Sequence, residues 1–156
     1  MKFSLIVRAA VFAVAALFVT AAYASTATTT MGITAAVAKD CAIAAAPLNF
    51  GNYNGSVELH TSAAVTANCT NTTPYVITLS SAGTYKLAGT GANTDTLNYT
   101  LTASDYTTLL SGVLVAANAA TGNGANQSYT VYGVVAGSQV VRPDNYSDTV
   151  TLTITY

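Results

Sequence analysis

Few side chains in this sequence could carry out chemistry, and their spacing matches none of the common catalytic arrangements. The one histidine, His60 in ELHTS, has no serine or cysteine motif at a recognisable distance, and G-x-S-x-G does not occur. Asp144 and Asp148 are two carboxylates near the end of the sequence, but no oxygen-rich loop of the calcium-binding kind surrounds them. We therefore expect no catalytic residue, no metal site and no cofactor, and we expect His60 to lie in a loop.

The two cysteines, Cys41 and Cys69, are the remaining reactive groups. They form no C-x-x-C motif, and a single histidine leaves a zinc site without enough ligands. In an oxidising compartment an even pair of cysteines favours a structural bridge over a metal or redox site. We predict a Cys41–Cys69 disulfide that joins an early strand to the next one.

The first 24 residues have the features of a secretory signal peptide, which would export the chain to an oxidising compartment. Lys2 and Arg8 lie near the start, the apolar run VFAVAALFV is too short to span a bilayer, and Ala22-Tyr23-Ala24 is a small-x-small cleavage site. The alternative, an uncleaved membrane anchor, is less consistent with the sequence because no stop-transfer segment follows. We predict a cleaved signal peptide over residues 1–24.

The charge of the remaining chain excludes some classes of partner. Three basic residues, Lys39, Lys86 and Arg142, stand against six acidic ones, which gives a net charge of −3. No basic face is available for nucleic acid or for an anionic membrane.

Short runs with a period of two recur along the chain and are separated by turn residues. Such alternation predicts half-buried strands, whereas no apolar stripe with a period of 3.6 residues persists. The loops GTGANTD and ATGNGANQS have the composition of β-hairpin connections. The fold class is therefore all-β, and the predicted disulfide favours an immunoglobulin-like sandwich. The predicted strands are SAAVTANC, PYVITLSSAG, TYKLAG, TLNYTLTA, SGVLVAA and QSYTVYGVVA.

Two further segments alternate in the same way and have no evident neighbour. At the C-terminal end the apolar residues alternate with threonines, and these residues are Val150, Leu152, Ile154 and Tyr156. Nothing after this strand covers its edge, so what lies beside it is open. Near the N-terminus a second alternating set consists of Met31, Ile33, Ala35 and Val37. An unstructured tail is the alternative interpretation of this second set.

Several stretches together resemble the spore coat protein U domain family, which includes pilin subunits of the archaic chaperone-usher pathway. They are CAIAAAPLNFGNY, VTANCTNTTPYVITLSSAGTY, LNYTL, YTVYGVVAGSQ and NYSDTVTLTITY. The resemblance implies an incomplete immunoglobulin-like β-sandwich that lacks its final strand and is completed by a donor strand from a neighbouring subunit. It implies that the N-terminal set above is the donor and that the C-terminal set is the acceptor edge strand. The domains would then be the signal peptide (1–24), a donor-strand extension (25–40) and a pilin domain (41–156).

The implied function is that of a structural pilin which polymerises into a cell-surface fibre for adhesion and biofilm formation. The expected partners are neighbouring pilin subunits, a periplasmic chaperone and an outer-membrane usher. The chain would pass through the periplasm to the cell surface. Two alternatives keep the same fold: a secreted surface coat, and a sugar-binding module that uses some of the nine tyrosines after residue 24.

Overall fold

The computed structural model describes residues 24–81 and 84–156, so residues 1–23 of the predicted signal peptide lie outside the described residues. The chain divides into two units, Met1–Ala35 and Ala36–Tyr156. In the described part of the first unit, residues 24–35 belong to no helix or strand and are exposed. The second unit is built from strands, and the described residues contain no helix, which confirms the all-β class. No helix among them is long and apolar enough to cross a membrane.

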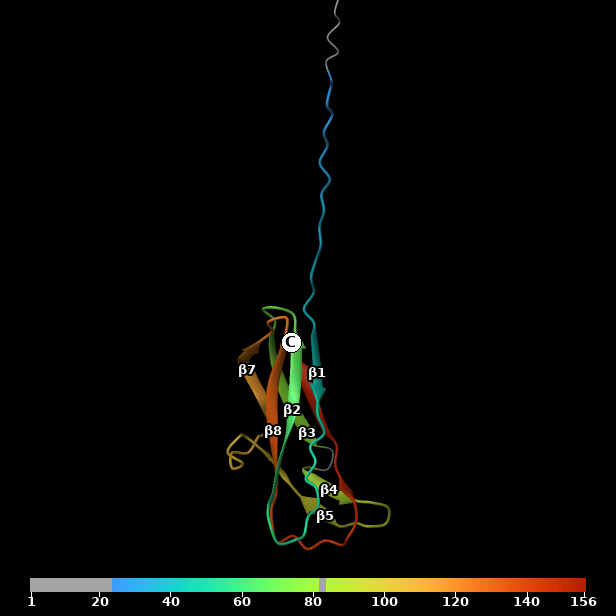
Figure 1. The fold of residues 1–156 in the computed structure, drawn as a ribbon, viewed down its shortest axis with the longest axis vertical. Helices are drawn as coiled ribbons and strands as arrows, with labels where there is room; N and C mark the ends of the chain where they lie inside the picture. The colour runs from blue at the N-terminus through green and yellow to red at the C-terminus, as the bar shows by residue number, and fades with distance from the viewer. Residues whose placement is uncertain (1–23, 82–83) are drawn as a thin grey trace, which may run out of the picture. The chain divides into compact units, whose positions relative to one another are not determined.

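Two antiparallel sheets form the sandwich of the second unit (Figure 1). The four-stranded sheet has the order β1-β2-β8-β6, and its strands are β1 (Cys41–Ala45), β2 (Leu59–Cys69), β8 (Asn126–Val135) and β6 (Thr100–Thr102). The three-stranded sheet has the order β10-β3-β7, with β10 (Val150–Thr155), β3 (Pro74–Ser81) and β7 (Val113–Thr121). A smaller sheet, in the order β5-β4-β9, consists of β5 (Thr96–Asn98), β4 (Lys86–Gly89) and β9 (Tyr146–Ser147).

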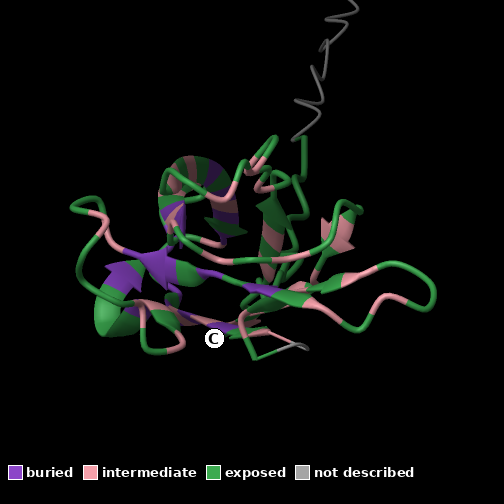
Figure 2. Cartoon of the chain, turned by 90° about the horizontal axis from the view of Figure 1, so that it is seen from below, coloured by how far each residue is buried: buried purple, intermediate pink, exposed green. Residues whose placement is uncertain are grey.

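The core lies between the two larger sheets, and the alternation in the sequence decides which side chains enter it. Val65 of β2, Leu79 of β3 and Val131 of β8 belong to one buried cluster. Cys69 of β2 and Tyr75 of β3 belong to a second. Figure 2 shows that burial is concentrated on the strands while the loops are exposed. The residues predicted to face inward on β2 and β3 are buried, as the period of two requires: Ala63, Val65, Ala67, Cys69, Tyr75, Ile77 and Leu79.

The run TLNYTLTA is not one strand, as the sequence suggested, but two strands in different sheets. β5 pairs with β4, whereas β6 pairs with β8. The chain crosses between these sheets at Tyr99, whose backbone N–H donates to the carbonyl oxygen of Tyr85. Leu97, Tyr99 and Leu101 are nevertheless all buried. A period of two reports which side chains are buried, but it cannot reveal that the hydrogen-bonding partner changes along the run.

Two other expectations about connections are corrected. The loop ATGNGANQS is not a hairpin turn, because it carries the chain from β7 in one sheet to β8 in the other. His60 is not a loop residue, since it lies in β2 opposite Val134 of β8. By contrast, GTGANTD does join the paired strands β4 and β5 as a hairpin.

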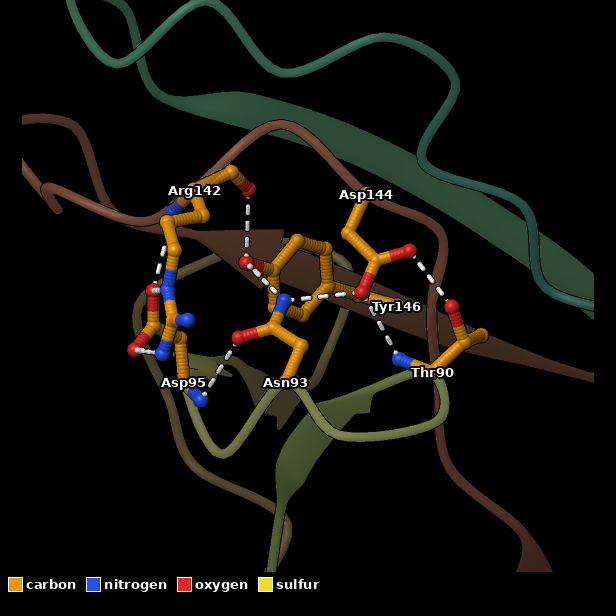
Figure 3. A network of polar contacts seen from close by, with 6 residues as sticks. All are labelled: Thr90, Asn93, Asp95, Arg142, Asp144 and Tyr146. Atoms are coloured by element: carbon orange, nitrogen blue, oxygen red, sulfur yellow. Dashed lines mark hydrogen bonds and ion pairs between the residues drawn. The ribbon is translucent and has the colours of Figure 1, made fainter.

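A polar network ties the β4–β5 hairpin to the segment that leads into β9 and β10 (Figure 3). Asp144 accepts hydrogen bonds from the backbone N–H and hydroxyl of Thr90 and from the side-chain amide of Asn93. Arg142 donates from Nε and Nη2 to the two carboxylate oxygens of Asp95, each at 3.0 Å. These contacts fix the path of the chain just before its last strand.

Candidate functional site

The candidate site is the opening between β1 and β10, each of which is the outermost strand of its sheet. β1 pairs with β2 and β10 pairs with β3, and no backbone pairing joins β1 to β10 among the described residues, although the two strands lie close together. In Figure 1 the red C-terminal strand is visible beside β1. Each strand therefore offers one edge of peptide groups to a further strand.

A groove of about 330 Å³ opens at one end of this region, between the first half of β10 and the segment that follows β1, and it reaches the core. Ile154 and Tyr156 are not part of its lining. The segment that follows β1 forms one wall through Leu48 and Phe50, and Val150 and Leu152 of β10 form the opposite wall. Other apolar side chains form the floor, namely Val65, Leu79, Leu101 and Val131. Its lining favours an apolar occupant.

Close packing against β8 holds the Leu48 and Phe50 wall in place. A Cβ atom at Gly133 would lie 2.8 Å from Phe50 Cζ and 2.9 Å from Leu48 Cδ2, so a larger residue there would push these two side chains away from the strand. The ring of Phe50 also packs against Tyr99, with the ring centroids 5.9 Å apart. The wall is thus built from tertiary contacts rather than from strand pairing.

The residues predicted to form the acceptor strand differ in how far they are covered. Val150, Leu152 and Ile154 are half-buried and pack against the core clusters, while the threonines between them are exposed. Tyr156 is 51% exposed and lies just beyond the end of β10. Half-burial of a strand's apolar face, with one edge lacking a backbone partner, is the state expected of a surface that a further strand would cover.

One end of the groove is polar, because Asp148 is part of its lining. Asp148 accepts hydrogen bonds from the hydroxyl of Tyr99 at 2.6 Å and from the hydroxyl of Ser81 at 2.5 Å. Burial, and then the hydrogen bond to Asp148, raises the pKa of Tyr99 above its ordinary value. The phenol therefore remains a proton donor to the carboxylate at any physiological pH.

The disulfide fixes the first residue of β1, whereas the groove lies beside the last residue of that strand. Cys41 and Cys69 are bonded to one another and stand directly opposite in the β1–β2 register. The residue before the bridge is also anchored, since Thr70 N–H donates to the carbonyl oxygen of Asp40 and Asp40 N–H donates to Thr70 Oγ1. The last residue of the N-terminal extension, Asp40, is therefore held against the residue that follows β2.

The predicted donor residues are all exposed. Met31 is 83% exposed, and Ile33 and Val37 are each 88% exposed. Ala35 is exposed as well, and residues 24–40 belong to no strand. Their assignment as a donor strand stays a prediction.

The other residues considered for chemistry lie apart from this groove. His60 Nε2 contacts Glu58 Oε1, and the ring of His60 packs against Tyr106 with the centroids 4.5 Å apart. The described residues hold no group of three or more side chains of the metal-binding types. What the groove can do is bind an extended chain, through backbone hydrogen bonds along β10 and alternate side chains in its interior.

Sequence reasoning did not assign Leu48, Phe50 or Asp148 to the groove. Leu48 and Phe50 alternate within LNFGNY, which was a usable signal for one apolar face, but no pattern showed that this face would lie opposite β10. Asp148 lies two residues before Val150 and four before Leu152. Its side chain therefore points to the same side as theirs in an extended chain, and its position on the groove side could have been predicted from the alternation.

The chain was compared with protein families, with curated proteins and with solved structures. The family model of the spore coat protein U domain matches residues 27–153. A comparison with curated proteins finds no match.

Several solved structures are similar, including the following two. One is the crystal structure of the CsuC–CsuE chaperone–tip adhesion subunit pre-assembly complex from archaic chaperone-usher Csu pili of Acinetobacter baumannii, with a TM-score of 0.51 and 22% identity. The match covers 77% of this chain and 40% of that one, so this chain spans less than half of the other chain's length. The other is the Escherichia coli Hda pilus minor tip subunit HdaB, with a TM-score of 0.37, 16% identity, and coverage of 74% and 79%.

Proposed function

The chain belongs to the spore coat protein U domain family, and we propose that it is a structural pilin subunit that polymerises by donor-strand complementation. The N-terminal extension of one copy enters the groove of the next and completes its sandwich. The product is a cell-surface fibre that serves adhesion and biofilm formation.

The observation that carries this proposal is the free edge of β10 beside an apolar groove. A strand added there gains main-chain hydrogen bonds along its length, and its alternate side chains enter the interior. The face that alternates in the extension consists of Met31, Ile33, Ala35 and Val37. These four side chains span as many residues as Val150 to Tyr156, so the two apolar faces match in length.

An open edge beside a groove is an aggregation hazard in a free subunit, which is why the proposal includes further partners. A periplasmic chaperone would cover the groove after export, and an outer-membrane usher would direct the exchange for a neighbouring subunit. The similar structure from the Csu pilus is a complex of a subunit with its chaperone. The N-terminal signal peptide would deliver the chain to the periplasm.

The test compares two substitutions on opposite faces of the extension. Ile33→Asp should abolish fibres, because it places a carboxylate in an apolar groove, and loss of a buried isoleucine alone costs about 2 to 5 kcal/mol at each junction. Thr34→Asp changes the adjacent residue on the other face and should be milder. Fibres are counted by electron microscopy of sheared material and by gel analysis. Equal assembly of Ile33→Asp and the unmodified protein would refute the proposal.

The same microscopy bears on the alternative that the family name suggests. A surface coat would give an amorphous layer rather than thin filaments.

A further inference from the structure

We propose that Lys39 of an incoming copy binds Asp148 of the receiving copy, and that this ion pair fixes the direction and register of the inserted strand. The inference rests on the proposed function, because it concerns how the donor strand lies in the groove. It uses two charged residues that flank the apolar patterns, and Asp148 would bind Lys39 in addition to the hydroxyls of Tyr99 and Ser81.

The alternation of the extension continues past its last apolar residue. Lys39 follows Val37 by two positions, so in an extended chain its side chain points to the same side as Ile33 and Val37. The predicted acceptor strand also carries a charged residue two positions beyond its apolar series, at the N-terminal end of that series. Asp148 precedes Val150 by two positions, is only partly exposed, and lines the groove. Each apolar series therefore carries one charge at one end, and the two charges have opposite signs.

Antiparallel insertion brings these two charges together. Residues directly opposite in an antiparallel pair have side chains on the same face. If Ile33 lies opposite Ile154, then Val37 lies opposite Val150 and Lys39 lies opposite Asp148. Parallel insertion with the same apolar overlap puts Thr29 beside Asp148 and leaves Lys39 at the far end of the strand. The charges therefore favour the antiparallel direction.

The same pair selects one register among those that keep the apolar face inward. Since the period of a strand is two, the donor can slip only in steps of two residues without turning its threonines into the groove. One step places Lys39 beside Val150, and the opposite step places Val37 beside Asp148. Either step desolvates a charge against an apolar side chain, which disfavours the wrong register.

The scarcity of charge strengthens the assignment. The chain after residue 24 has three basic residues, and Arg142 is bound to Asp95. Lys39 is exposed and directly precedes Asp40, whose backbone is anchored to Thr70. Its side chain is thus presented close to a fixed point of its own domain.

Interchain disulfides test the direction. Ala38 should lie opposite Thr149 in the proposed register, at a separation that a disulfide can bridge, whereas parallel insertion would place Thr30 there. Thr149 is exposed, and the native cysteines are already bonded to one another. The full chain carrying both Ala38→Cys and Thr149→Cys should give fibres that run as a covalent ladder on a non-reducing gel and collapse with reductant. The matched control carries Thr30→Cys with Thr149→Cys and should give no ladder. If Thr149→Cys impairs assembly, Ala36→Cys with Thr151→Cys replaces the first pair.

Charge reversal tests the ion pair itself. Fibres of Lys39→Glu should dissociate about fivefold faster in low salt than unmodified fibres, and the difference should shrink in 1 M salt. Lys86→Glu, at an exposed lysine on β4, is the control and should leave the rate unchanged.

The outcomes separate the two proposals. A ladder from Thr30→Cys with Thr149→Cys would overturn the antiparallel register but keep donor-strand assembly. A ladder from Ala38→Cys with unchanged dissociation of Lys39→Glu would overturn the ion pair. Fibres that form normally without any ladder, and that also tolerate Ile33→Asp, would overturn the proposed function as well.

Discussion

The hydroxyl of Tyr99 donates a hydrogen bond of 2.6 Å to Asp148, and this contact joins the point where the chain changes sheets to the segment that leads into β10. Tyr99 is buried, whereas Asp148 is partly exposed at the groove. The hydrogen bond holds the carboxylate at the polar end of the groove.

Tyr99→Phe should therefore destabilise the mature chain by about 1.5 to 3 kcal/mol, since it removes a hydrogen bond to a charged group and keeps the ring. The midpoint of urea unfolding measures the effect. Tyr156→Phe, at a half-exposed ring beyond the end of β10, is the control and should shift the midpoint by less than about 0.5 kcal/mol. Equal midpoints for the two variants would show that the Tyr99 contact adds no stability.

Cys69→Ser should lower the abundance of the subunit, because the disulfide closes a loop with a sequence separation of 28 and contributes roughly 3 to 4 kcal/mol on the chain-entropy model. Immunoblots of cell extracts measure abundance. Mass spectrometry without reduction should find the two cysteine peptides linked in the unmodified protein. Two free thiols in protein from the cell surface would contradict this prediction.

Acid should weaken the polar network beside β9. Hydrogen bonds from Thr90, then Asn93 and Asn145, hold the pKa of Asp144 well below its ordinary value of 3.8. A lowered pKa in the folded state contributes stability above the ordinary value, and that contribution is lost as the pH falls through the folded pKa. Stability should decline below about pH 4, and the decline should be smaller in Asp144→Asn.

Urea unfolding of the mature chain at a series of pH values measures this decline. Asp40→Asn is the control, because the contacts of Asp40 with Thr70 are made by backbone atoms. An acid profile of Asp144→Asn that matches the unmodified protein would contradict the role of the network.

Removal of residues 25–37 should leave a subunit that self-associates when purified alone. The groove then has no donor from any copy, while Val150, Leu152 and the β10 edge remain available for non-specific pairing. Light scattering and dye binding to exposed apolar surface measure the effect. A stable monomer from this truncated chain would contradict the idea of an incomplete sandwich.

The sequence alone determined the class of the fold and the inward face of most strands. Alternation in β2 and β3 predicted the buried side chains, because a strand's period of two follows from local backbone geometry and is the same in any sheet. The even pair of cysteines and the predicted export signal led to the prediction of the disulfide that joins β1 to β2. The residues also carried the family resemblance that the domain match bears out.

Only the tertiary structure decided which strands become neighbours. TLNYTLTA reads as one strand, yet its two halves pair with β4 and β8, and the turn after β7 crosses between sheets instead of closing a hairpin. The groove depends on the same long-range choices, since Phe50 and Val150 are far apart in the chain and meet across the opening. Alternation specifies a face but not a partner, because pairing energy comes from contacts between segments that the local pattern does not contain.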